Sequence, residues 1–309
     1  MRIRILGSGA GGGFPQWNCN CANCRAVRAG EAGFSARTQS SLAVSADGAN
    51  WVLLNASPDL REQIAAAAQL APAEGDPVRA SPIKAVALTN GDVDHVAGLL
   101  NLREAQPFSV YAAGRVLSAL AANPIFTILQ PQLVPRMELP MDEAVPLHGA
   151  GVDLGLSIRA FPVPGKIALY LEDKSAPNFG TSAGDTLGLQ IIETKTGASF
   201  FYIPGCAKVD DALAARLRGA ALVFFDGTLF HENEMIEQGL MGKTGSRMGH
   251  VNMSGADGSM AAFAPLGVAR KIYVHINNSN PVLNANSPEH AIARDAGWEI
   301  GADGMEVTL

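Results

Sequence analysis

Hydrophobic residues recur along the chain in short runs that alternate with segments of helical periodicity. Runs of about four to eight apolar residues bounded by Gly, Pro, Asn or Asp predict strands, and apolar positions three or four apart predict helices. Strands are expected at 2–6, 40–45, 51–56, 83–89, 108–111, 152–163, 187–192, 199–203, 221–225 and 271–276, and helices at 57–70, 115–122 and 257–265. This alternation predicts an α/β protein, with Ser57 as the N-cap of its first helix.

The stretch Ile83–Glu104 carries the densest group of polar side chains. A buried strand is expected to end at Asn90, and Asp92, Asp94 and His95 follow just before a helix. Open α/β sheets bind ligands at this end of a strand, and two carboxylates this close repel each other unless a cation or a proton intervenes. A helix N-cap would explain Asp94 but not the whole cluster. We therefore predict a metal site here.

Composition excludes several classes of function. A formal net charge of −6 without any basic run argues against an extended nucleic-acid surface. No apolar run approaches the roughly 18 residues of a membrane span, and the chain starts with an alternating strand rather than a secretory signal. Three of the four cysteines lie within six residues, which in a reducing compartment indicates metal binding rather than disulfides. We expect a cytoplasmic protein.

The second candidate metal site is the C-x-C-x-x-C cluster of Cys19, Cys21 and Cys24. Three thiolates and a fourth ligand would hold a structural Zn²⁺. The alternative is three free thiols in a loop, which would oxidise readily. His231 is a chemically suitable fourth ligand. The preceding glycines, Gly7–Gly13, lack the helix that a dinucleotide-binding loop requires, so we expect them to let the backbone approach the metal centre.

The second half of the chain carries four further candidate residues. The segment Met241–Ser254 is glycine-rich and contains Lys243, Arg247 and His250. It suits a lid or a clamp on a carboxylate-bearing substrate, and the alternative is a solvated loop. His275 lies near the end of a predicted strand, where a buried histidine is either a hydrogen-bonded core residue or a metal ligand.

These motifs carry a family resemblance. Thr-Asn-Gly-Asp-Val-Asp-His at 89–95 resembles the Thr-His-x-His-x-Asp-His signature of the metallo-β-lactamase fold, with Asn90 and Asp92 in place of the first two histidines. Over essentially its whole length the chain resembles the pyrroloquinoline quinone (PQQ) biosynthesis B family. The resemblance implies an α/β αββα four-layer sandwich in a single domain, residues 1–309, and makes His275 a metal ligand.

The resemblance also bears on the zinc cluster. Related phosphodiesterases complete a similar cysteine cluster with a histidine three residues after their last site histidine, and Asn278 holds that position here. The fourth zinc ligand therefore stays open between His231, Asn278 and another group. Family hydrolases also place a bridging Asp near Cys206, which is here either a ligand or a small buried residue.

The available ligands distinguish between the chemistries of the fold. Dinuclear hydrolases need two cations about 4 Å apart, but the imidazoles of one site are replaced here at Asn90, Asp92 and Pro164-Gly165. Two imidazoles and one carboxylate remain, which is the ligand set of mononuclear non-haem Fe(II) oxygenases. We expect an Fe²⁺ enzyme, with Zn²⁺ able to fill the site in the isolated protein. The metal ligands are Asp94, His95 and His275.

The resemblance implies that the substrate is the tyrosine ring of a peptide-derived Glu–Tyr precursor on the PQQ pathway, which the enzyme hydroxylates. Asp92 is an extra ligand or an orienting carboxylate, and His250 a proton-transfer or substrate-binding group. Lys243 and Arg247 are candidate contacts for a substrate carboxylate. The expected partners are a small peptide-derived or PQQ-like substrate and O₂, with no nucleic acid and no membrane, and a homodimer stays open.

Two other functions stay open. A metal-dependent hydrolase would need a second occupied metal site. A carrier or transport-assisting protein for PQQ or its precursor would bind its ligand tightly without turnover.

Overall fold

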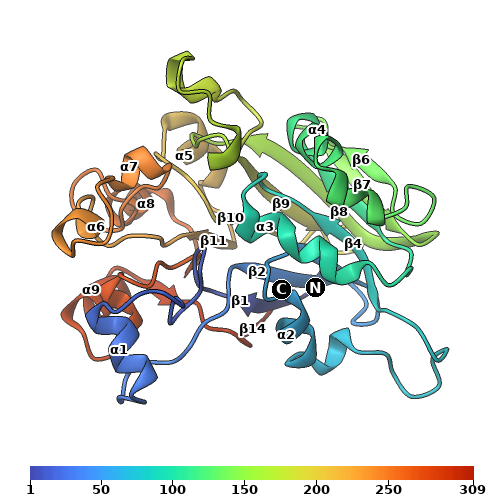
Figure 1. Ribbon diagram of the computed structural model, residues 1–309, viewed down its shortest axis with the longest axis horizontal. Coiled ribbons are helices and arrows are strands. Elements are labelled where there is room, and N and C mark those ends of the chain that lie inside the picture. Colours follow the sequence, from blue (N-terminus) through green and yellow to red (C-terminus); the bar gives the residue numbers. More distant parts are fainter.

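The structure is a computed structural model that describes residues 1–309, and it contains two seven-stranded sheets packed face to face (Figure 1). In spatial order the first sheet comprises β14 (Glu306–Thr308), β1 (Arg2–Gly7), β2 (Ser41–Ser45), β3 (Trp51–Leu54), β4 (Ile83–Ala87), β5 (Ser109–Ala112) and β6 (Arg136–Glu138). The second comprises β13 (Trp298–Ile300), β12 (Arg270–Val274), β11 (Leu222–Asp226), β10 (Ser199–Ile203), β9 (Leu187–Glu193), β8 (Val152–Pro162) and β7 (Ala144–Gly149).

Helices cover the outer faces of both sheets, so the predicted αββα sandwich is confirmed. On the first sheet lie α2 (Leu60–Ala65), α3 (Val93–Val96) and α4 (Gly114–Ala122), and on the second α5 (Asp211–Leu217), α8 (Ser259–Phe263) and α9 (Pro288–Asp295). The helices α1 (Ala22–Arg28), α6 (Glu234–Glu237) and α7 (Gly245–Met248) lie around one edge of the sandwich (Figure 1). Single 3₁₀ segments span Ala68–Leu70, Ala97–Leu102, Pro124–Ile128, Leu169–Leu171, Pro177–Gly180, Ala264–Leu266 and Pro281–Leu283.

The core lies between the sheets and continues under the helices. Leu54 and Val86 of the first sheet share one apolar cluster with Leu189 and Phe224 of the second, and all four are fully buried. Strands covered on both faces read as nearly continuous apolar runs, which is why β4 and β11 were predictable. A second cluster, which includes Phe263 of α8, packs on the outer face of the second sheet.

One edge of the sandwich collects the polar loops. The strands β3, β4 and β5 run parallel, as do β10, β11 and β12. The loops after β4, β11 and β12 therefore leave from carboxyl ends, where open α/β folds place their sites. The glycine loop after β1 joins them, since Ala10 N–H donates to the carbonyl of Ile276 at 2.8 Å.

Local details differ from the sequence predictions. The helix expected at 57–70 is broken into α2 and a 3₁₀ turn, and Ser57 is not its N-cap because its hydroxyl donates to Gln63 Oε1 at 3.1 Å. The segment Met241–Ser254 is not a plain loop but contains α7. The strands β6, β7, β13 and β14 were not predicted. The longest helix has nine residues, too short to cross a membrane, and the structure contains no membrane-spanning helix.

Candidate metal centre

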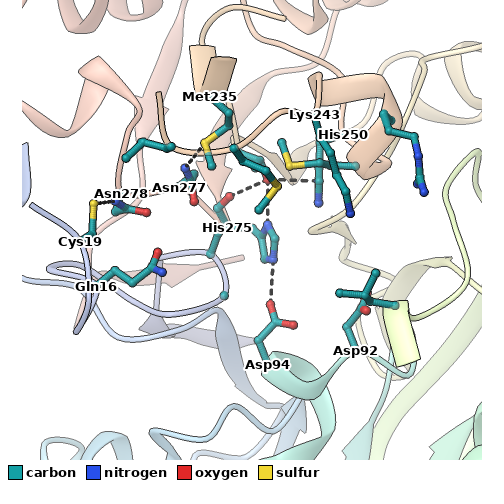
Figure 2. A pocket seen from close by; sticks show the side chains of 18 of the residues that line it. Gln16, Cys19, Asp92, Asp94, Met235, Lys243, His250, His275, Asn277 and Asn278 are labelled. Atoms are coloured by element: carbon teal, nitrogen blue, oxygen red, sulfur yellow. Dashed lines mark hydrogen bonds and ion pairs between the residues drawn. The ribbon is translucent and has the colours of Figure 1, made fainter. Parts of the chain in front are cut away.

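The predicted ligands Asp94, His95 and His275 meet at one point. Asp94 and His95 lie in α3, directly after β4, and His275 follows the last residue of β12. Asp94 Oδ2 lies 3.1 Å from Nε2 of His275 and 3.6 Å from Nε2 of His95. One ligand atom from each residue lies within 4.8 Å of the others. The three side chains, 181 residues apart at the extremes, thus present one carboxylate and two imidazoles to a common centre. Figure 2 shows the contact between Asp94 and His275.

The surroundings of His95 fit a bound cation. Its side chain is buried, and Nδ1 lies 2.7 Å from Asn90 Oδ1 and 3.3 Å from Thr89 Oγ1. Asn90 Oδ1 also accepts the Asp92 backbone N–H, so this oxygen is an acceptor and His95 Nδ1 carries the proton. The buried Nε2 has no hydrogen-bond partner. A buried polar atom without a partner is costly, and a metal ion would supply one.

His275 is held in an uncommon backbone conformation. Its φ of 56° lies in the left-handed region, which non-glycine residues rarely adopt. The Thr228 hydroxyl lies 2.9 Å from Nδ1 of His275 and 2.7 Å from Asp226 Oδ1. Because a carboxylate only accepts, the hydroxyl proton goes to Asp226, and the Thr228 oxygen accepts from His275 Nδ1–H. With Nδ1 protonated by this contact, Nε2 is the ring nitrogen that faces Asp94 and would bind a metal.

The burial and the charges of these three residues shift their pKa values in directions that favour cation binding. Burial alone would raise the pKa of Asp94, but the His95 and His275 imidazoles outweigh burial and hold the pKa well below its ordinary value. Burial lowers the pKa of His95, which keeps its ring neutral. Burial opposes the charged form of His275 too, but its hydrogen bond to Asp94 and the negative charges around it raise the pKa. In the metal-free protein the His275–Asp94 pair thus shares a proton that a metal would displace.

Asp226 and His250 form a dyad next to the metal ligands. Asp226 ends β11, is fully buried, and lies 2.6 Å through Oδ2 from His250 Nδ1. The His250 ring stacks on that of His275 with centroids 5.2 Å apart. Burial would raise the pKa of Asp226, but the charge and hydrogen bond of His250 keep it below its usual value. Since Nδ1 faces Asp226, Nε2 is the His250 nitrogen available to the cavity.

Asp92 lies at the centre's rim rather than in the convergent group. It occupies the N-cap position of α3 without making a side-chain capping bond, and it lines the cavity. Asp94, which the sequence offered as a possible N-cap, lies inside the first turn of α3. Gly11 approaches closely, since a Cβ on it would lie 3.4 Å from Asp94 Oδ2. The glycine loop therefore brings backbone against the metal centre, as the sequence predicted.

The three clustered cysteines also converge. The Sγ atoms of Cys19, Cys21 and Cys24 lie within 4.8 Å of one another. The side-chain amide of Asn278 lies 3.1, 3.7 and 3.4 Å from these sulfurs, in that order. Burial raises the pKa of Cys24 to about 11, so this thiol loses its proton only to a metal or another strong partner. The arrangement fits a tetrahedral zinc site with Asn278 next to the fourth position.

Two other candidates lie elsewhere. His231 Nδ1 lies 3.0 Å from the Ser254 hydroxyl, and its ring packs on Phe230 rather than beside the cysteines. Cys206 is fully buried, its Sγ donates to the carbonyl of Lys208 at 3.1 Å, and burial raises the pKa of its thiol. It behaves as a small protonated core residue, and its backbone N–H donates to Asp226 Oδ2.

A cavity of about 640 Å³ connects both metal-binding groups. Asp94, His95, His250 and His275 line it, together with the cysteine loop. Lys243 and His250 lie on the wall opposite Asp92 and Asp94 (Figure 2). This volume is in the range of small-ligand sites.

Sequence reasoning missed four residues of this region. Arg247, a predicted substrate contact, already pairs with Glu172, which the sequence did not single out. Asp226 and Thr228 position the histidines, and Lys166 lines the cavity. Only Asp226 had a signal in the sequence, because it directly follows a predicted buried strand.

Comparison with known proteins agrees with this geometry. A family model described as "Beta-lactamase superfamily domain" matches residues 50–276. Proteins named "Coenzyme PQQ synthesis protein B" are 52% identical in Xanthomonas oryzae pv. oryzae and 53% identical in Rhodopseudomonas palustris, each over the full length of both chains. The crystal structure of Zn²⁺-bound PqqB from Methylobacterium extorquens superposes with a TM-score of 0.93, 47% identity and full coverage of both chains.

A more distant neighbour shows the fold alone. A diphosphatase of the PhnP family is 21% identical, with a TM-score of 0.68 over 99% of this chain and 97% of its own. The fold thus extends beyond the close relatives, whereas the full-length identity is shared with the proteins of PQQ synthesis. The chain belongs to the coenzyme PQQ synthesis protein B family and has the metallo-β-lactamase fold.

Proposed function

We propose that this protein is a mononuclear non-haem iron oxygenase that hydroxylates the tyrosine ring of a peptide-derived Glu–Tyr precursor in PQQ biosynthesis. The observation that carries the proposal is the convergence of Asp94, His95 and His275 as a set of one carboxylate and two imidazoles. Asn90, which stands where dinuclear relatives have a further imidazole, is turned to His95 Nδ1 instead. This ligand set suits one redox metal with open positions.

Asp94, His95 and His275 would hold the ion. An Fe²⁺ ion bound there would supply redox activity and the open coordination positions that O₂ activation requires, whereas Zn²⁺ in the same place is redox-inert. Hydroxylation would put one atom of O₂ into the ring and reduce the other to water, with two protons and with two electrons from an external reductant of the ascorbate class. Asp92 lies at the rim of the centre and its carboxylate makes no hydrogen bond, so this side chain is free to serve as an additional ligand or to orient a bound group.

The dyad of His250 and Asp226 would accept a proton from the substrate. Asp226 accepts from His250 Nδ1, which fixes the tautomer and leaves Nε2 with a lone pair towards the cavity. A phenol placed in the cavity can donate its proton to this nitrogen, and the buried carboxylate stabilises the resulting imidazolium. His250 is thus the general base, and Asp226 positions it.

The cysteine cluster would hold a structural Zn²⁺. Cys21 is the N-cap of α1 and Cys24 lies inside it, so a metal here would join the start of this helix to the loop of Asn278. Asn278 would supply its amide oxygen as a fourth ligand after rotation of the side chain. Such a site contributes to folding directly.

The two rival functions differ in what they require. In the second group able to bind a metal, the Asp226 carboxylate and the Nδ1 atoms of His250 and His275 are engaged with one another and with Thr228. No specific observation therefore favours a dinuclear hydrolase. A carrier would use the same cavity without turnover.

Reconstitution with different metals tests the proposal. The protein is stripped, reloaded with Fe²⁺ under argon, mixed with the Glu–Tyr dipeptide and ascorbate as the reductant, and exposed to ¹⁸O₂. We expect O₂ uptake and label in the ring of the product, and no hydroxylation by the all-zinc protein. Robust turnover of a substrate by the all-zinc protein under argon would show a hydrolase, and tight binding without O₂ uptake would show a carrier.

A further inference from the structure

Three cationic side chains line the cavity, and they are not equivalent. The guanidinium of Arg247 lies 3.3 Å from both carboxylate oxygens of Glu172 and stacks on the ring of Phe179 at 3.9 Å from its centroid. The two terminal nitrogens of Arg247 are thus already paired with a carboxylate, and the Phe179 ring covers one face of the guanidinium plane. Arg247 forms part of the cavity wall and is not free to bind another anion.

Lys166 and Lys243 have no such partner. Neither ammonium group forms an ion pair or a hydrogen bond within the protein, although both side chains are half-buried and line the same cavity as the metal ligands. Both ammonium groups lie close enough to Glu172 to help lower its pKa, after the larger effect of Arg247. An ammonium group carries three donors, so both groups can engage an anionic ligand in the cavity.

The backbone that presents Lys166 is fixed. The Thr186 hydroxyl donates to the carbonyl of Lys166 at 3.0 Å, and a Cβ on Gly165 would lie 2.4 Å from that hydroxyl oxygen. The stem of Lys166 runs along Gly249, because a Cβ placed there would lie 2.9 Å from Lys166 Cγ. Gly249 directly precedes His250, so the lysine passes beside the proposed base. The position is built before a ligand arrives, which reduces the entropic cost of binding.

The charges of the cavity are therefore divided into two poles. Glu172 forms an ion pair with Arg247, and the remaining acidic residues of the cavity, Asp92 and Asp94, lie on the wall opposite Lys243 (Figure 2). The lysine side carries two unpaired positive charges. A ligand that spans the cavity meets the metal ligands at one end and two ammonium groups at the other.

We propose that Lys166 and Lys243 form a carboxylate-binding pole that orients a peptide carboxylate of the substrate while its reacting end faces Asp94, His95 and His275. This inference rests on the proposed function for the identity of the substrate, a tyrosine-containing acidic dipeptide. It assigns Lys166 a role in specificity. It also names Lys166, and not Arg247, as the residue that binds the substrate carboxylate together with Lys243. Two lysines on one carboxylate select for negative charge, so amidated or uncharged peptides bind poorly.

The test measures binding, not turnover. Zinc-loaded protein is titrated calorimetrically under argon with three peptides: Glu–Tyr, Gln–Tyr and Glu–Tyr with an amidated C-terminus. The variants are K166M and K243M, and K174M is the matched control because Lys174 is exposed and lies outside the cavity. We expect K166M and K243M each to weaken binding of Glu–Tyr by about tenfold or more, and K174M to bind like the wild type.

The three peptides separate a charge contact from a packing effect. The loss in K166M and K243M should disappear for the peptide that lacks the recognised carboxylate, whichever of the two it is. Equal losses for all three peptides, no loss at all, or a wild type that does not prefer Glu–Tyr would each overturn the pole. Melting temperature and metal content check the fold, and if K166M is unstable, K166R should retain binding while K166Q loses it. Charge-dependent binding without any O₂-dependent product would refute the oxygenase and still support the carboxylate-binding role of Lys166 and Lys243.

Discussion

Replacing Asn90 and His95 in turn tests the geometry of the centre most directly. Both residues lie in the motif that resembles the hydrolase signature, and both are buried. The structure gives them different tasks, because His95 directs a partnerless Nε2 at Asp94 while Asn90 accepts from His95 Nδ1 at 2.7 Å. If one metal is bound as proposed, His95→Ala removes a ligand, whereas Asn90→Ala removes only the group that orients it.

The structure sets the expected size of each effect. Loss of a hydrogen-bond partner behind a metal-binding histidine typically weakens metal binding by about 10- to 100-fold, or about 1.4 to 2.8 kcal/mol. Thr89 Oγ1 lies 3.3 Å from the same His95 nitrogen and provides a second acceptor. We therefore expect Asn90→Ala to fall near the lower end, about tenfold. Asn90→Asp should bind at least as tightly as the wild type, since a carboxylate is a stronger acceptor.

Competition between the stripped protein and a chromophoric chelator measures these affinities, and elemental analysis counts the metals in each chain. At a metal concentration that fills the wild type, Asn90→Ala should retain its active-site metal and His95→Ala should lose it. The zinc at the cysteines should survive both changes. If Asn90→Ala empties the centre as completely as His95→Ala, then Asn90 is a ligand and the mononuclear model is wrong.

The remaining predictions concern the cysteine cluster and pH. Cys21→Ser should lose one zinc per chain and melt at a lower temperature, because a structural zinc site contributes folding free energy. Cys206→Ser should keep its zinc, and equal zinc contents in the two variants would contradict the assignment. In the metal-free protein Asp94 raises the pKa of His275, so below that raised pKa a metal must displace a proton, and its affinity should rise about tenfold per pH unit and level off above it. Titrations from about pH 6 to pH 8 check this, and an affinity that is independent of pH in that range would refute the shared proton.

The sequence predicted the interior of the fold better than its edges. Strands such as β4 and β11 lie between two layers, and this burial makes them nearly continuous apolar runs that a pattern detects. The edge strands β6, β13 and β14 have three residues each, and their pairing depends on neighbours distant in the chain. The predicted helix at 57–70 divides into α2 and a 3₁₀ turn, and Ser57 bonds to Gln63 of α2 instead of capping the helix.

In the site, the chemistry of single residues was predictable but their pairing was not. Asp94 and His95 are adjacent in sequence, and His275 lies at a predicted strand end. By contrast, Arg247 looked like a free cation until the structure placed Glu172, 75 residues away, against it. No local pattern encodes that ion pair, because it exists only after the two loops meet above the sheet edge.

The two metal-binding groups are connected through one short loop, residues 275–280. Asn278 of the cysteine cluster lies three residues after His275, and Asn23 of α1 donates to the carbonyls of Asn278, Ser279 and Asn280 at 3.1, 3.2 and 3.0 Å. A left-handed backbone at a residue such as His275 costs roughly 1–3 kcal/mol and persists only where its surroundings impose it. A metal at the cysteines would tighten that constraint. The structural site would then serve the chemistry by holding a strained ligand in place.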